Sequence, residues 1–398
     1  MLYNGISKGA LQMKKILAVI LSALILCTAS ACASSGSSEA SDTASASSAV
    51  STVSSEESKA EESVQASAVY EEDEEEGISL ICEDSDLKTE LEDIVNQFEY
   101  EGMIYITKGG KTLAEYAGGE PEDGIAVDAE TPMPVGSVSK QFCAAAILKL
   151  QEEGKLSIED TLSKYYPEYT IGKDIKLKYM LSNRSGITNF FEGMEKGISN
   201  DHTYEQNSED IKKMLFEHEL NSEPDSKFEY SNSNFFLLAD ILEQITGEKY
   251  EAYIRKNFFE PLGMTHTGTI NEMLDGASFA KGAVYKKIDS QRGLTKGAGD
   301  ILSTGEDMTL WLKGLSEGKI ISQDSYRLMT ENYSPGNDYG YGLYLVYNGV
   351  GHPGAIGQYT AYDFINTDKD FTVVIISSTL DTYSLTNLVQ QLILKVSS

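Results

Sequence analysis

The fold is decided by a stretch that leaves a loop and begins a helix, Pro134-Val135-Gly136-Ser137-Val138-Ser139-Lys140-Gln141-Phe142-Cys143-Ala144-Ala145-Ala146-Ile147-Leu148. Gly136 frees the backbone just before Ser137, and good helix formers follow with an apolar stripe that includes Phe142 and Ile147. Ser137 and Lys140 are three residues apart, so on this helix they share one face. Ser137 falls in the first turn, where unpaired backbone N–H groups point outward and favour negative charge.

The Ser137/Lys140 pair has the chemistry of an activated nucleophile. A serine hydroxyl is weakly nucleophilic until a base takes its proton, and a lysine can do so only if burial or cationic neighbours lower its pKa. The same spacing also fits an ordinary capped helix start. It occurs again at Ser316 and Lys319, where glycines and charged residues indicate a surface loop. Ser137 and Lys140 therefore need partners elsewhere in the chain.

The composition excludes one class of partner. The 398 residues include 62 acidic and 32 basic side chains, a formal net charge of −30, whereas nucleic-acid binding needs a basic surface. Much of the acidity lies in residues 33–77, which hold 12 Asp/Glu and one Lys and almost no aromatic side chains. Such a segment buries too little apolar surface to offset its ordering entropy, so we predict a disordered acidic tether.

The N-terminus has the anatomy of a secretory signal. Basic residues follow Met13, a short apolar run spans 16–26, and small residues lead to Cys32. The run is too short for a good spanning helix. The residues before Cys32 resemble a bacterial lipoprotein cleavage box, although Ala29 stands where leucine is usual. We expect lipidation of Cys32 and anchoring to the outer face of the membrane at the bacterial cell surface. The alternative is ordinary cleavage and secretion.

Three segments follow from these patterns: a signal peptide of lipoprotein type over 1–32, the tether over 33–77, and one folded domain over 78–398. The sequence leaves open whether translation starts at Met1 or at Met13. The remaining cysteines, Cys82 and Cys143, have no metal-like spacing, and two cysteines alone do not establish a disulfide. Cys143 lies on the apolar side of its helix, so we interpret it as a buried thiol.

Within the folded domain, strands are predicted at both ends and helices between them. Apolar spacing predicts a first helix over 87–98, capped by Ser85 or Asp86, and then a hairpin of 103–107 with 111–116. Later elements are helices at 234–246, 250–259 (ended by Pro261), 306–315 and 384–395, and strands at 340–347, 358–366 and 371–377. Pairing the N- and C-terminal strands gives an α+β fold, an antiparallel sheet flanked by helices with a mostly helical inserted lobe.

A second candidate stretch is Tyr230-Ser231-Asn232, which precedes a strong helix. A tyrosine beside a lysine ammonium can be held nearer its anionic form and act as a general base. Asn232 carries both an amide carbonyl and an NH₂ group, so it can bridge Lys140 and a substrate amide. Taken singly, Tyr230 also fits a half-buried loop residue and Asn232 a helix cap.

A third stretch is Gly351-His352-Pro353-Gly354-Ala355, in which glycines bracket a histidine and lead into a strand. Glycine permits close backbone approach to a ligand, and a strand edge offers N–H groups. His352 alone also fits a turn residue. A competing His-x-Gly occurs at His266, but it follows a helix exit with no strand soon after it, so we favour His352.

The ordered set of Ser137-x-x-Lys140, Tyr230-x-Asn232 and His352-x-Gly354 resembles the serine β-lactamase and penicillin-binding-protein-like hydrolase superfamily. By pattern it is most similar to class C β-lactamases, D-Ala-D-Ala carboxypeptidases of the Tyr-x-Asn type and β-lactamase-like esterases. Further segments resemble the superfamily over about residues 85–395, namely 177–187, 260–264, 299–311 and 339–343. In the third of these, Asp300 stands where a second glycine is common.

The resemblance implies a role for each residue. Ser137 is the nucleophile, and Lys140 and Tyr230 share proton transfer in acylation and deacylation. Asn232 positions Lys140 and the substrate amide. His352 and Gly354 belong to the third motif, and the backbone N–H groups of Ser137 and Ala355 form the oxyanion hole. No metal or organic cofactor is implied.

His352 departs from the lysine usual in true β-lactamases. Lysine offers a permanent charge to a substrate carboxylate, whereas histidine near pH 7 is only partly charged. We therefore expect a peptidase, amidase, carboxypeptidase or esterase rather than a strong β-lactamase. No deacylating glutamate of the class A kind is identified.

Two functions remain open at this stage. The first is a surface-tethered serine hydrolase that forms an acyl-enzyme with a small peptide, ester or β-lactam. The second is a non-catalytic or slowly acylated binder or sensor of cell-wall peptide or β-lactam on the same scaffold. The sequence specifies neither the substrate nor the oligomeric state.

Overall fold

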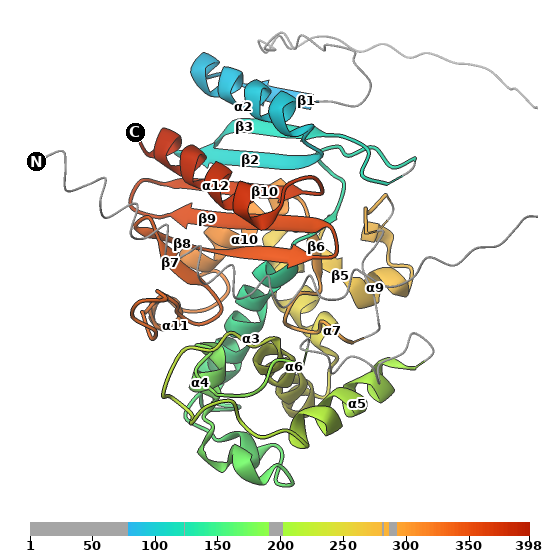
Figure 1. Ribbon diagram of the computed structural model, residues 1–398, viewed down its shortest axis with the longest axis vertical. Helices are drawn as coiled ribbons and strands as arrows, with labels where there is room; N and C mark the ends of the chain where they lie inside the picture. The colour runs from blue at the N-terminus through green and yellow to red at the C-terminus, as the bar shows by residue number, and fades with distance from the viewer. Residues whose placement is uncertain (1–78, 123, 191–201, 281, 286–292) are drawn as a thin grey trace, which may run out of the picture.

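An antiparallel sheet joins the two ends of the folded chain (Figure 1). In the part of the chain that the computed structural model describes, seven strands pair in the order β1-β3-β2-β10-β9-β8-β7. Their bounds are Ser79–Cys82 (β1), Gly102–Lys108 (β2), Lys111–Gly118 (β3), Tyr344–Val346 (β7), Gly349–Ile356 (β8), Tyr359–Asn366 (β9) and Phe371–Ser377 (β10). Because β2 pairs with β10, the N-terminal hairpin and the C-terminal strands form one sheet, which confirms the predicted α+β class.

The structure describes residues 79–398 except 123, 191–201, 281 and 286–292. The predicted signal peptide, the tether and Cys32 lie outside the described residues, so those assignments remain predictions. Within the described ranges, no helix is long and apolar enough to cross a membrane. Cys82 and Cys143 are both unbridged, and Cys143 is buried as expected.

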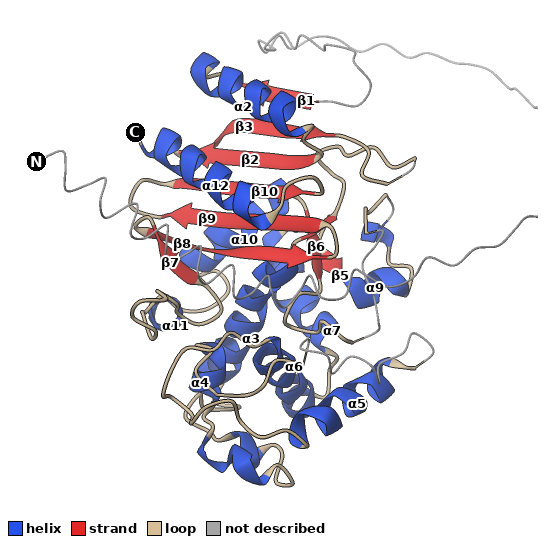
Figure 2. Ribbon diagram, in the orientation of Figure 1, coloured by secondary structure: helices blue, strands red, loops and turns tan. Residues whose placement is uncertain are grey.

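Helices cover both faces of the sheet (Figure 2). Side chains alternate along a strand, so in β10 Val373 and Ile375 face one core while Val374 and Ile376 face the other. The first core is closed by α2 (Ser85–Phe98) and α12 (Thr382–Ser397), and the second by α10 (Gly305–Ser316) and the helical lobe. The central strands are therefore apolar on both faces, unlike a sheet with one face in water.

The helical lobe lies between the two halves of the sheet in sequence. Its first element is a 3₁₀ turn, η2 (Gly136–Ser139), which leads directly into α3 (Lys140–Glu152). The other helices are α4 (Leu177–Leu181), α5 (Tyr204–Phe216), α6 (Asn232–Thr246), α7 (Tyr250–Ile254), α8 (Glu260–Leu262), α9 (Ile270–Leu274) and α11 (Gln323–Met329), with short 3₁₀ turns at 162–164, 170–174 and 278–280. A small sheet, β4-β6-β5, is formed by Met133–Pro134, Ile301–Ser303 and Gly268–Thr269.

Some predicted boundaries are wrong at the start of the domain and near residue 340. The fold begins with β1, and α2 is capped by Asp84, whose carboxylate accepts from the N–H groups of Asp86 and Leu87, rather than by Ser85 or Asp86. The predicted strand 340–347 shrinks to β7. Gly342 has φ +71°, and a Cβ there would lie 2.7 Å from the Lys140 carbonyl oxygen, so this segment bends over α3 instead of extending.

Two further expectations are corrected. The glycine-rich stretch around His352 is itself strand β8, because pairing with β7 and β9 overrides its low strand propensity. The predicted helix 250–259 continues through a π-helical turn (Arg255–Phe259) into α8, with Pro261 close to its start. Pro261 lies within α8 directly after the π-helical turn, and the helix ends instead at Gly263, which has φ +74°.

Trp311 tests the packing of α10 against α3. Its ring is fully buried and stacks on Phe142 with centroids 3.8 Å apart. We predict that Trp311→Ala lowers the free energy of unfolding by about 3–5 kcal/mol, measured by chemical denaturation, because it leaves a large cavity. Tyr383→Ala, on the exposed face of α12, should change it by less than about 0.5 kcal/mol. Similar effects of the two variants would contradict the described packing.

Candidate active site

Lys140 is the centre of the candidate site. Its side chain is fully buried at the start of α3, and its Nζ donates to three oxygens. These are Ser137 Oγ at 3.0 Å, Asn232 Oδ1 at 2.7 Å and the backbone carbonyl of Ala298 at 2.6 Å. Residues from η2, from α6 and from the turn before β6 therefore meet at one amine.

These contacts define what a neutral Lys140 can do. A neutral amine has two N–H donors and one lone pair. The Asn232 and Ala298 oxygens are acceptors, so they take the two N–H groups. Of the three neighbours, only the Ser137 hydroxyl can donate, and the lone pair is left facing it. The arrangement is thus suited to removing the Ser137 proton.

The second motif lies beside this amine. Lys140 Nζ is 4.9 Å from the centroid of the half-buried Tyr230 ring. Asn232 is the first residue of α6, and its backbone N and Nδ2 lie 3.2 and 3.3 Å from Asn189 Oδ1. The structure therefore brings Ser137, Lys140, Tyr230 and Asn232 together, as the motifs predict.

The sequence reasoning missed residues that hold this arrangement. Asn189 was not singled out, and Ala298 contributes only a backbone carbonyl, which a side-chain motif cannot indicate. A buried amide network under α6 was also missed. Asn183 Oδ1 accepts from Ser231 N at 3.1 Å and from Asn234 Nδ2 at 3.0 Å, and Asn234 Oδ1 accepts from the hydroxyl of Ser185 at 2.6 Å. The polar run 182–189 is visible in the sequence, but its partners at the start of α6 lie more than 40 residues further along the chain.

The third motif approaches Ser137 through its backbone. A Cβ on Gly354 would lie 1.9 Å from the Val135 carbonyl oxygen and 3.1 Å from Ser137 N. A Cβ on Gly136, which has φ +52°, would lie 2.7 Å from Ala355 N. Both glycines are required by this contact between β8 and η2. It brings Ser137 N close to Gly354 and Ala355 N close to Gly136, so the two backbone nitrogens that the resemblance assigns to an oxyanion hole lie in the same region.

His352 does not carry the partial charge that we expected. It is buried, and burial and then the charge of Lys140 lower its pKa to about 3, so the ring is neutral near pH 7. Its Nδ1 lies 2.5 Å from the Pro353 carbonyl oxygen, which can only accept, so Nδ1 carries the proton. Its Nε2 then accepts from the Tyr339 hydroxyl at 3.3 Å. His352 supports β8 and offers no cation to a substrate.

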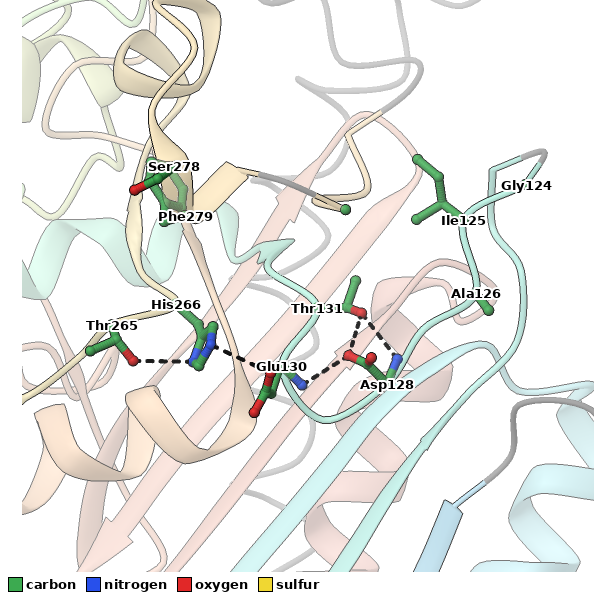
Figure 3. A pocket seen from close by; sticks show the side chains of 11 residues that line it. Gly124, Ile125, Ala126, Asp128, Glu130, Thr131, Thr265, His266, Ser278 and Phe279 are labelled. Carbon is green, nitrogen blue, oxygen red and sulfur yellow. Dashed lines mark hydrogen bonds and ion pairs between the residues drawn. The ribbon is translucent and has the colours of Figure 1, made fainter. Parts of the chain in front are cut away.

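The competing motifs lie elsewhere. His266 lines a separate, open cavity of about 530 Å³ (Figure 3), where it faces Thr265 and pairs with Glu130 Oε2 at 3.8 Å. None of the predicted catalytic side chains lines this cavity. Ser316 ends α10, and Lys319 is exposed and paired with Glu317. Among the described residues, no cluster of three or more His, Cys, Asp or Glu side chains could hold a metal ion.

Asp300, the departure noted in the glycine-rich segment, lies two residues beyond the carbonyl that receives Lys140. It is buried, and no donor lies in good hydrogen-bond geometry to either carboxyl oxygen. Burial raises the pKa of Asp300 to about 8, and the nearby N–H groups of Gly297 and Asp300 only moderate the shift. The Asp300 carboxyl is therefore largely protonated at neutral pH.

Comparison with known proteins agrees with this geometry. The Beta-lactamase family profile matches residues 91–396. A putative penicillin-binding protein of Bacillus subtilis (strain 168), PbpX, is 28% identical over 306 residues, 74% of each chain. Protein flp of Staphylococcus aureus (strain COL) is 25% identical over 301 residues, 69% of this chain and 59% of its own length. The D-amino acid amidase of Ochrobactrum anthropi SV3 shares the fold, with a TM-score of 0.66 at 21% identity over 78% of this chain and 98% of the amidase.

Fold and motif order together define a serine hydrolase of the β-lactamase and penicillin-binding-protein type. The chain belongs to the Beta-lactamase family.

The close approach of β8 to η2 can be tested with Gly354→Ala. The new methyl group meets backbone atoms that cannot move aside, so the variant should lose the Ser137/Ala355 geometry and acylate about 10²–10³-fold more slowly. Rates of active-site labelling measure this loss. Gly299→Ala is a matched control near the same site, because its methyl group finds its nearest neighbour at an ordinary 3.7 Å. Equal rates in the two variants would contradict the prediction.

Asp300→Asn tests the buried carboxyl. Between about pH 4 and 8 the folded protein keeps this proton while the unfolded chain releases it, so wild-type stability falls as pH rises through this window. The Asp300→Asn variant has no titrating group at this position, so it does not show this fall in stability. We predict that its stability relative to wild type rises by about 2 kcal/mol or more between pH 4.5 and 8, measured by denaturation. The same substitution at the exposed Asp368 should show no such trend.

Proposed function

We propose that this protein is a serine hydrolase that acts on an amide or ester through an acyl-enzyme at Ser137. The observation that carries the proposal is the coordination of Lys140: two of its three oxygen neighbours can only accept, so once the amine is neutral its lone pair is directed at the serine hydroxyl. An oriented base of this kind typically contributes about 10²–10⁴ in rate. Membership of the Beta-lactamase family supports the same reaction class.

In the proposed acylation, Ser137 Oγ attacks the substrate carbonyl carbon as Lys140 Nζ takes the hydroxyl proton. The carbonyl oxygen becomes an oxyanion between the backbone N–H groups of Ser137 and Ala355. When the intermediate collapses, the bond to the leaving amine or alcohol breaks, and that group takes a proton relayed by Lys140 and Tyr230, whose ring lies beside the amine. Water then repeats the sequence on the acyl-enzyme and releases the acid.

The neutral His352 narrows the proposed substrate. True β-lactamases usually carry a lysine in this motif to meet a substrate carboxylate, whereas His352 is uncharged and turned toward Tyr339. This supports peptidase, amidase or esterase activity over strong β-lactam hydrolysis. The amide of Asn232, already fixed by Lys140 and Asn189, is suited to position the substrate amide.

We further propose that the hydrolase works at the bacterial cell surface. A lipid on Cys32 and the acidic tether over 33–77 would hold the domain away from the membrane. The support for this part is the sequence of the leader alone.

Ser137→Ala tests the proposal most directly. Intact-mass spectrometry after mixing with a fluorophosphonate should show one adduct on the wild-type protein and none on the variant. Lys140→Met should slow labelling by at least about 100-fold, because the base is lost. Ser316→Ala and Lys319→Met, at the second Ser-x-x-Lys, are matched controls and should label at the wild-type rate.

The decay of a penicillin adduct then separates an enzyme from a slowly acylated sensor. If the penicillin adduct is hydrolysed and free enzyme is regenerated, the result supports a hydrolase. If the adduct persists and the protein also fails to hydrolyse ester and amide substrates, the result supports a sensor. Absence of any adduct with either probe on the folded wild-type protein would overturn the catalytic proposal.

A further inference from the structure

Asp363 is a carboxylate in an apolar layer. It lies on β9, near the middle of the sheet (Figure 1), with 1% of its surface exposed. Its neighbours on the same face of the strand, Ala361 and Ile365, belong to the core that packs against the helical lobe. Burial raises the pKa of Asp363 to about 7. Burying a carboxylate is costly unless strong hydrogen bonds compensate, so its presence calls for a specific role.

The hydrogen bonds of Asp363 reach two elements of the site. Gln141 Nε2 donates to Oδ1 at 2.7 Å and to Oδ2 at 2.8 Å, and the backbone N–H of His352 donates to Oδ1 at 2.8 Å. Gln141 is the residue after Lys140 on α3, and His352 lies three residues before Ala355 on β8. The Trp311 indole donates to Gln141 Oε1 at 3.1 Å, which fixes the orientation of the Gln141 amide.

We propose that Asp363 is a positioning residue that fixes β8 against the start of α3 and thereby sets the spacing between the backbone N–H groups of Ser137 and Ala355. The inference rests on the proposed acyl-transfer function. Asp363 touches no reacting atom in this arrangement. It acts through Gln141 on the helix that carries Lys140 and through His352 on the strand that carries Ala355.

The sheet alone does not supply this link. Backbone pairing holds β8 to β9 from Val350 to Ile356, but it leaves the distance from the sheet to α3 unset. Apolar packing against α3 tolerates small shifts, whereas a hydrogen-bonded carboxylate accepts little change in its donor positions. An error of about 1 Å in an active site can cost about 100-fold in rate, so such a link matters for catalysis more than for folding.

A contribution to folding stability alone does not readily explain why a carboxylate is buried at position 363. Replacing a buried charged group and its partner by well-packed apolar side chains is often neutral or stabilising. A leucine at 363 opposite a methionine at 141 would remove the buried charge, and the stability it regains would be offset only by the unpaired N–H groups of His352 and Trp311. A purely stabilising role and a positioning role therefore predict different acylation rates for the double variant Asp363→Leu/Gln141→Met.

The test begins with Asp363→Asn, which keeps the shape but turns one acceptor into a donor facing Gln141. We expect acylation by fluorophosphonate, per folded molecule, to slow about 10- to 100-fold. Affinity for a boronic acid, whose adduct with Ser137 has a tetrahedral oxyanion, should fall in parallel, while KM for an ester substrate stays within about threefold. Gln141→Met removes the link from the helix side and should show the same pattern.

Asp307→Asn is the matched control. Asp307 is another buried carboxylate with a raised pKa, and it accepts from His266 N at 2.9 Å and Thr267 Oγ1 at 2.7 Å, away from Ser137. Its variant should alter stability but not the rate per folded molecule. The double variant Asp363→Leu/Gln141→Met should recover part of the stability lost in the single variants, because it removes the buried charge but leaves the His352 and Trp311 N–H groups unpaired, and it should recover neither the rate nor the boronic-acid affinity.

Amide hydrogen exchange supplies a readout that does not depend on catalysis. Segments 349–356 and 135–140 should exchange faster in Asp363→Asn than in Asp307→Asn. The inference would be overturned if Asp363→Asn showed the wild-type acylation rate and wild-type amide exchange. It would also be overturned if the double variant recovered the full wild-type acylation rate. If the folded wild-type protein forms no adduct at all, the proposed function fails, and the exchange experiment alone decides whether Asp363 positions β8.

Discussion

The site depends on burying one lysine amine among three oxygens that come from separate parts of the chain. The Ser137 hydroxyl is local to Lys140, but Asn232 is 92 residues away and the Ala298 carbonyl 158 residues away. Each contact is within hydrogen-bond distance, and the amine has no access to water. The helical lobe can therefore be understood as the scaffold that brings α6 and the turn before β6 to the start of α3.

A second constraint is steric. Gly136 and Gly354 allow two backbones to touch where side chains would keep them apart, and this contact joins the lobe to the sheet at Ser137. The hydrogen bonds of Asp363 to Gln141 and to the His352 backbone join the same two elements, α3 and β8. The lysine amine and the paired backbone nitrogens thus approach the serine from different layers of the fold, so the geometry of the site depends on how those layers are joined.

Sequence patterns predicted those parts of the molecule whose cause is local. The helices near 87–98 and 306–315, the first hairpin and the strands β9 and β10 follow from short-range periodicity, and the Ser137/Lys140 and Tyr230/Asn232 motifs were recognisable because each lies at the start of a helix. The strand character of β8 and the neutrality of His352 depend on neighbouring strands and on burial. Asn189, the Ala298 carbonyl and Asp363 act through contacts distant in sequence, which no local pattern indicates.

The pairing of β2 with β10 also governs how this chain acquires its structure. Gly102 pairs with Ser377, so the middle of the sheet joins segments from opposite ends of the domain. Contacts between residues so far apart in sequence carry a large loop-closure entropy and slow folding. A nascent chain exposes the apolar faces of its first hairpin until the last strand has been synthesised. Loss of even the final thirty or so residues removes β10 and leaves β2 as an open edge that can pair with other chains.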